Sequence, residues 1–124
     1  AEGTCPLSDI RANTISAANG TDPVALTKQS AAKAWVNINQ IGTQAIQDSF
    51  NISSITDLNP GRTTVTLSNS MSNTNYSSVM GSDYNSSQGN MGQLVGSVGM
   101  AMLNSGNSYE DRDNACIQIM GDLA

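Results

Sequence analysis

Short runs in which polar and apolar residues alternate constrain the fold of this chain most. In the segment 33–40, KAWVNINQ, the apolar Ala34, Val36 and Ile38 alternate with a tryptophan and two asparagines. The segments 63–68 and 115–119 repeat the pattern. Because neighbouring side chains of a β-strand point to opposite faces, a period of two is typical of a strand that buries one face. The pattern therefore predicts short strands with one apolar and one polar face, and it places the single tryptophan on a polar face.

Turn-forming residues separate these runs. Ser, Thr, Asn and Gly make up 52 of the 124 residues. A helix bundle would need long runs of Ala, Leu, Glu and Lys, which the chain lacks. Short strands at this spacing are typical of a β-sandwich. We therefore predict an all-β fold: a small β-sandwich of five to seven short antiparallel strands, almost without helix.

Local signals place the elements between these runs. The segment 43–56 has a weaker strand pattern with a bend at 48–51. Pro60-Gly61 supplies the fixed φ and the positive φ of a type II turn, so residues 56–69 predict a hairpin. We also expect a strand at 75–81, a loop at 82–92, and one longer strand at 93–104 that its glycines bend.

The first 27 residues differ from the rest because they lack a core pattern of their own. Turn signals interrupt them, so 10–16 and 23–27 are long enough only for short strands. We therefore divide the chain into an extended N-terminal arm, 1–27, and a β-sandwich domain, 28–124, which opens with one helical turn at 28–34. An arm of this kind must dock on the body, on another subunit or on a larger assembly. The apolar residues expected to anchor it are Ile10, Ile15, Val24 and Leu26.

Charge and composition exclude several classes of function. The net charge is −5 and the five basic residues are scattered, so the chain lacks the basic patch that nucleic-acid binding needs. No segment reaches the roughly 20 apolar residues of a membrane span. The chain has no His, so it lacks the usual general base and the commonest transition-metal ligand. We therefore expect no nucleic-acid or membrane partner, no cofactor and no enzyme activity.

The N-terminus and the two cysteines bear on the compartment in which the chain is made. The N-terminal sequence AEGTCPLSD is acidic and lacks the apolar stretch of a secretory signal, so we expect synthesis in a cytoplasm. A disulfide between Cys5 and Cys116 would close almost the whole chain. In a reducing cytoplasm two free thiols are favoured, with Cys116 as a small buried side chain. The sequence leaves both states open.

Two further features are candidate binding sites. The loop 82–92 is rich in the adaptable residue types of contact surfaces, and its centre, Asp83, Tyr84 and Asn85, is a candidate for an exposed contact. A plain surface loop is favoured over this contact. Trp35 on its polar strand face is suited to stacking on a sugar, although a buried anchor or a subunit contact is favoured.

The acidic segment 109–114, YEDRDN, is a candidate cation site. Glu110, Asp111 and Asp113 offer the oxygen ligands that Ca²⁺ prefers. Their spacing differs from that of calcium loops, which use alternate positions and a glycine. Arg112 also offsets part of their charge. A solvated turn is therefore favoured over a calcium site.

A longer pattern resembles a known family. ALTKQSAAKAWVNIN, then IQDSFNISSITD, a hairpin turn and TVTLSNSMSNTNYS resemble a β-domain of tail fibres and other virion surface proteins of tailed bacteriophages. The likeness covers roughly residues 10 to 80. The turn LNPGR and Leu67 depart from it, since the family has a Gly-rich turn and a Phe there. The matching positions are Lys33, Ala34, Trp35, Ser49, Phe50, Asn51, Ser53, Ser54, Asp57, Thr64, Val65, Leu67, Asn75 and Tyr76.

The resemblance implies a structural component of a virion, a homotrimer without enzyme activity. It also implies that the aromatics are anchors of a small β-domain. The residues expected to serve as core or interface anchors are Trp35, Phe50, Ile52, Val65, Leu67 and Tyr76.

Length favours one member of this class. Tail fibres need an attachment domain and a long shaft, whereas 124 residues suffice only for an arm and one β-domain. We therefore expect a capsid decoration protein, such as a cement, knob or head-fibre protein, made in the host bacterial cytoplasm and docked on the major capsid protein or another virion protein through its arm. The alternative is a short tail-fibre or adhesin component that binds a glycan or protein of the host surface.

Overall fold

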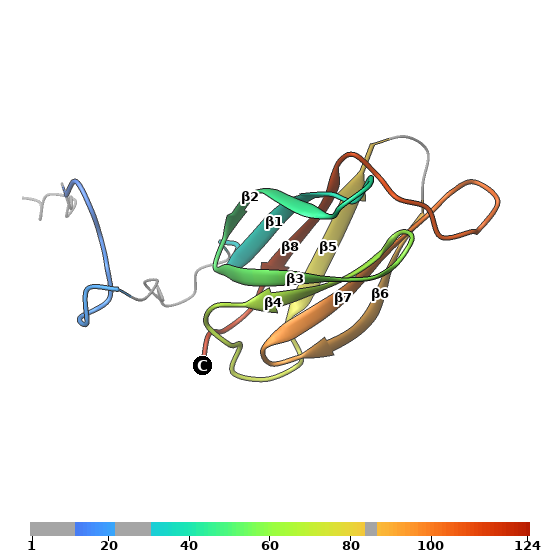
Figure 1. The fold of residues 1–124 in the computed structure, drawn as a ribbon. Helices are drawn as coiled ribbons and strands as arrows, with labels where there is room; N and C mark the ends of the chain where they lie inside the picture. The colour runs from blue at the N-terminus through green and yellow to red at the C-terminus, as the bar shows by residue number, and fades with distance from the viewer. Residues whose placement is uncertain (1–11, 22–30, 84–86) are drawn as a thin grey trace, which may run out of the picture.

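The structure, a computed structural model, describes residues 12–21, 31–83 and 87–124. Within these ranges the chain forms eight strands and no helix, arranged as two four-stranded antiparallel sheets that pack as a sandwich (Figure 1). The predicted β-sandwich is confirmed, with eight strands in place of the predicted five to seven. The strands are β1 (Ala34–Asn39), β2 (Ala45–Phe50), β3 (Ile52–Asn59), β4 (Arg62–Leu67), β5 (Ser77–Ser82), β6 (Ser87–Leu94), β7 (Ser97–Leu103) and β8 (Ala115–Met120).

The strands divide between the sheets in an order that brings distant segments together. Sheet A has the order β2-β1-β8-β5, and sheet B has the order β3-β4-β7-β6. The chain changes sheet at Asn51, where the predicted bend is confirmed by a φ of +57°. Asn tolerates this left-handed conformation better than most residues. The Asn51 side chain holds the corner, because its Oδ1 accepts a hydrogen bond from Asn69 N at 2.8 Å and its Nδ2 donates to Lys33 O at 3.1 Å.

The core lies between the two sheets. Burial alternates along β1, β4 and β8, as the period of two predicted. Full burial of a large apolar side chain contributes about 1.5–3 kcal/mol, so this set is the main source of stability. Its members are Ala34, Val36, Ile38, Val65, Leu67, Met71, Tyr76, Val98, Met100, Met102, Ala115, Ile117 and Ile119.

The hairpin of β3 and β4 is confirmed, and its turn needs glycine. Gly61 has a φ of +70°, and a Cβ at this position would lie 2.5 Å from Met102 O. The close approach arises because Met102 N donates a hydrogen bond to Gly61 O at 2.7 Å. Asp111 Oδ1 accepts another from Gly61 N at 2.6 Å. The turn is thus held by two hydrogen bonds of Gly61, one with the backbone of β7 and one with Asp111 in the segment 104–114.

A buried polar network closes the same end of the sandwich. Gln40 is fully buried, and its Nε2 donates to Thr63 Oγ1 at 3.1 Å. Its Oε1 accepts a hydrogen bond from Arg112 N at 3.1 Å, and its own N donates to Arg112 O at 2.8 Å. Thr63 Oγ1 in turn donates to Gln44 Oε1 at 2.6 Å. Because buried polar groups are costly when unpaired, this network fixes the segment 104–114 to the strands.

Two sequence predictions are wrong in the region 82–104. The predicted single strand at 93–104 is a hairpin: β6 ends at Leu94, Val95-Gly96 forms the turn, and β7 begins at Ser97. The predicted loop at 82–92 contains most of β6. Ser, Asn and Gly are accepted there because β6 is an edge strand that is exposed along most of its length. A bulge between Asn90 and Gln93 further disguises its alternation.

The arm is described only in part. Residues 12–16 form no strand, and Gly20 N donates to Ala17 O in a turn that follows. Ile15 is 61% exposed. Ile10, Val24 and Leu26 and the predicted strand at 23–27 lie outside the described residues. Of the predicted helical turn at 28–34, the described part from residue 31 contains no helix.

Candidate functional site

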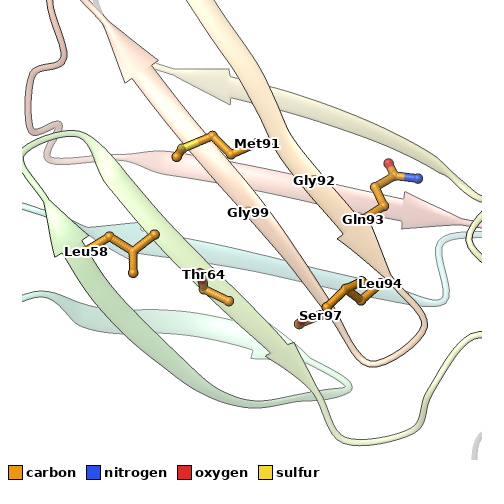
Figure 2. A pocket seen from close by; sticks show the side chains of 8 residues that line it. All are labelled: Leu58, Thr64, Met91, Gly92, Gln93, Leu94, Ser97 and Gly99. Carbon is orange, nitrogen blue, oxygen red and sulfur yellow. The ribbon is translucent and has the colours of Figure 1, made fainter.

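The outer face of sheet B carries a groove. Eight residues line it, and its volume is about 350 Å³. Figure 2 shows Leu58 and Thr64 on one side, Gly99 in the middle, and Met91 and Leu94 toward the other side. We call this the sheet B groove, and its lining residues are Leu58, Thr64, Met91, Gly92, Gln93, Leu94, Ser97 and Gly99.

The shape of the groove follows from residue size. The register β4–β7 places Thr64 opposite Gly99. The middle of the sheet therefore carries one short side chain, next to a glycine that has no side chain. A Cβ added at Gly99 would lie 3.0 Å from Met91 Cβ. The lack of a side chain at Gly99 therefore leaves room for Met91 of β6 to lie over β7. Leu58 and Leu94 are exposed at the margins, Leu94 to 65%. The result is a hollow bordered by projecting apolar side chains.

The chemistry of this face is uniform. None of the eight lining residues is ionisable or aromatic. The register extends the outer face with three more small residues, all uncharged: Ser54, Thr56 and Thr66. The nearest cation along β4 is Arg62, whose guanidinium lies 4.6 Å from the ring centroid of Tyr109 and is engaged there. The groove is suited to apolar contacts and holds no ionisable side chain for proton transfer.

The outer face of sheet A has a different character. The register places Trp35 opposite Phe50 on β2 and opposite Gln118 on β8, and Gln118 lies opposite Val79 on β5. Trp35 is half-buried and Phe50 is 42% exposed. The face therefore presents an aromatic pair beside amide side chains. We call Trp35 and Phe50 the aromatic pair.

The expected role of Trp35 and Phe50 as core anchors is wrong. Ala34 and Val36 point into the core from β1, so Trp35 between them must point outward. Phe50 ends an edge strand that is exposed along nearly its whole length. The alternation in the sequence already placed Trp35 on the polar face. A role of the pair in a subunit contact stays a prediction.

The other proposed anchors lie inside. Val65, Leu67 and Tyr76 are buried in the core, and Ile52 packs against it from β3. The hydroxyl of Tyr76 lies 2.9 Å from Leu94 O and 3.1 Å from Ser97 O, so it holds the β6–β7 turn. Burial raises the pKa of Tyr76 above its usual value.

The proposed contact loop is shorter than expected. Since β6 begins at Ser87, few residues remain between β5 and β6. Asp83 is half-buried, and its N donates to Asn114 O at 3.3 Å. Tyr84 and Asn85 lie outside the described residues, so an exposed contact there stays a prediction.

The acidic segment is mostly solvent-exposed, as expected of a solvated turn, but its Arg112 is docked against the strands. Arg112 is only 8% exposed, and its guanidinium pairs with Glu110 Oε2 at 3.1 Å. Asp111 holds Gly61 N, as described above. Two of the three proposed calcium ligands therefore already have partners. In the ranges that the structure covers, no group of three or more His, Cys, Asp or Glu side chains is placed to hold a metal ion.

Cys116 lies on the outer face of sheet A and carries a free thiol. It is half-buried, and its Sγ lies 3.4 Å from Asn37 Oδ1. Burial, followed by the negative charge of Asp83, raises the pKa of the Cys116 thiol. Cys5 lies outside the described residues. Among the residues described, no helix is long and apolar enough to cross a membrane.

Comparisons with known proteins identify no relative. The chain matches no protein-family model, no curated protein and no solved structure. The resemblance to the phage β-domain therefore stays a prediction. The sequence does not predict the sheet B groove, because the residues of β6 have the composition of a loop and Val95-Gly96 is not among the dipeptides that mark tight hairpin turns.

Proposed function

We propose that this chain is a structural protein of a bacteriophage virion that decorates the capsid. In this proposal the arm, 1–27, docks on the major capsid protein or another virion protein, and the β-sandwich forms a homotrimer outside it. The protein has no enzyme activity and needs no cofactor. It is made in the bacterial cytoplasm and functions in the virion.

The observation that carries the proposal is the sheet B groove, which is uncharged and bordered by exposed apolar side chains. Exposed Leu58, Met91 and Leu94 beside a hollow are typical of a surface that a protein partner covers. A groove without ionisable or aromatic groups supports mechanical attachment better than catalysis. The residue pattern that resembles virion surface proteins supports the same reading.

The mechanism is burial of apolar surface. Each Å² of apolar surface removed from water contributes about 25 cal/mol, although binding also costs translational and side-chain freedom. A decoration protein repeats each contact many times over a capsid. Small contacts of this kind stabilise a shell because the bound copies act together.

The test is the copy number of this chain in purified virions, measured by quantitative mass spectrometry against the major capsid protein. We expect hundreds of copies in a simple ratio to the capsid protein. A few dozen copies or fewer would overturn capsid decoration and place the chain on the tail or at a unique vertex. Absence of the chain from virions would overturn the whole proposal.

The aromatic pair favours a second candidate, an adhesin or short tail-fibre component. Trp35 and Phe50 face outward from adjacent strands, with Gln118 beside them. Aromatic faces next to amides suit the apolar faces and hydroxyl groups of a neutral glycan. The ligand need not be charged, since the residues that lie side by side across this face, Phe50, Trp35, Gln118 and Val79, include no ionisable residue.

The single tryptophan makes this candidate simple to test. Oligosaccharides of bacterial envelopes are titrated into the full chain while Trp35 fluorescence is recorded. The adhesin reading predicts a saturable change, and Phe50→Ala should weaken the affinity for the glycan about tenfold. Tyr109→Ala is the control, because Tyr109 is exposed on another surface and stacks on Arg62. No saturable change with any glycan, or equal loss in both variants, counts against the adhesin.

A further inference from the structure

The described acidic residues all avoid the sheet B groove and its three flanking small residues. Each copy carries a net charge of −5, so two copies repel wherever their carboxylates face each other. Asp57, on β3, lies next to Leu58 in sequence but is engaged elsewhere, since its Oδ1 accepts a hydrogen bond from Gln44 Nε2 at 3.0 Å. The described acidic residues are Asp48, Asp57, Asp83, Glu110, Asp111, Asp113 and Asp122.

This distribution bears on which partner fits the face. A basic partner would be drawn to the acidic surfaces, not to a face that lacks carboxylates. A second copy of this chain meets the opposite condition. It can approach without like-charge repulsion through a surface on which no carboxylate faces another. Apolar attraction between the exposed leucines and methionine then acts unopposed.

The relief of the face also fits a second copy. The same surface holds a hollow, over Gly99 and Thr64, and projections, Leu58 and Leu94. A twofold contact between identical subunits requires one surface to supply both the projecting and the receiving parts. A leucine of one copy entering the hollow of the next fulfils this requirement.

We propose that the sheet B groove, with Ser54, Thr56 and Thr66, is the contact between copies of this chain. The inference rests on the proposed function in that it names a twofold contact, separate from the threefold contact of the trimer, through which decorating copies meet. A four-stranded sheet with strands about 4.8 Å apart and about 20 Å long presents roughly 400 Å². Two such faces bury less than a standard interface of about 1,600 Å², so association is weak and depends on concentration.

The test is sedimentation velocity of the full chain over a concentration series from about 10 µM to about 1 mM. We expect a species with the mass of two or more chains to grow with concentration. Leu94→Glu places a carboxylate at the contact and weakens association about a hundredfold, because a charge would be buried without a partner. Leu58→Glu, on the other margin of the groove, acts in the same way and serves if the first variant fails to fold.

Val79→Glu is the matched control. Val79 is an exposed aliphatic residue of an edge strand, 53% exposed, but it belongs to the outer face of sheet A. We expect it to leave association unchanged. A monomer at every concentration, or an oligomer that Val79→Glu dissociates and Leu94→Glu does not, overturns the inference. The virion copy number is a separate measurement, so an assembling chain that is absent from virions overturns only the proposed function.

Discussion

Gln40 links strand β4 to the segment 104–114, and Gln40→Met tests whether this link stabilises the fold. Met has a similar volume and shape, so little cavity or strain energy is added. The substitution removes two hydrogen bonds, one to Thr63 Oγ1 and one from Arg112 N. The backbone bond from Gln40 N to Arg112 O remains.

The two losses differ in size. Arg112 N loses its acceptor at a buried residue, which costs about 1–3 kcal/mol. Thr63 keeps its hydrogen bond to Gln44 Oε1, so the loss of one donor costs only about 1 kcal/mol. The free energy of unfolding should therefore fall by about 2–4 kcal/mol. A double-mutant cycle with Thr63→Val should give a coupling energy of about 0.5–1.5 kcal/mol.

The assay is urea unfolding followed by Trp35 fluorescence and circular dichroism. With a slope of about 1.5 kcal/mol per M of urea, the unfolding midpoint should fall by about 1.3–2.7 M. Gln118→Met is the matched control, because Gln118 is exposed on β8, and it should change stability by less than about 0.5 kcal/mol. Equal midpoints for the two variants would show that the buried network does not stabilise the fold.

Three further substitutions probe other parts of the fold by the same unfolding assay. Gly61→Ala should lower the free energy of unfolding by more than about 3 kcal/mol, because the added Cβ would clash with backbone atoms. Gly42 has the same φ of +70° but lies in open space, so Gly42→Ala should cost only about 1 kcal/mol. Equal effects would contradict the close approach at Gly61. Asn51→Ala should cost about 1 kcal/mol more than Asn51→Gly, since glycine relieves the left-handed strain, and the reverse order would refute this. Tyr76→Phe should cost about 1–2 kcal/mol below pH 10. Because the folded-state pKa of Tyr76 lies above that of an unfolded tyrosine, part of the wild-type stability declines as pH rises through that pKa, and Tyr76→Phe should lack this part of the decline.

The sequence predicted the elements whose two faces differ in burial. Strands β1, β4 and β8 alternate between core and surface, so their period of two appears directly in the residues. Strand β6 escaped prediction because it is an edge strand with a bulge and is exposed along most of its length. Its Ser, Gln, Asn and Gly residues therefore look like a loop.

Long-range polar contacts were beyond the sequence for another reason. Gln40 and Arg112 meet only because the segment 104–114 folds back across β1 and β4. No local pattern signals that an acidic, glycine-containing segment will be docked. The sheet B groove likewise combines residues from four strands. Gly99 contributes to the hollow only because the fold places it beside Met91 and Thr64.

The central position of β8 has a consequence for the order of folding. Strand β8 pairs with both β1 and β5, so the two halves of sheet A cannot be joined until β8 has been synthesised. The hairpins β3–β4 and β6–β7 of sheet B join neighbours in sequence and can pair earlier. A contact that closes most of the domain raises the contact order and slows folding. The nascent chain therefore holds an incomplete sandwich until β8 has been synthesised, and a premature stop before β8 leaves β5 without a partner in sheet A.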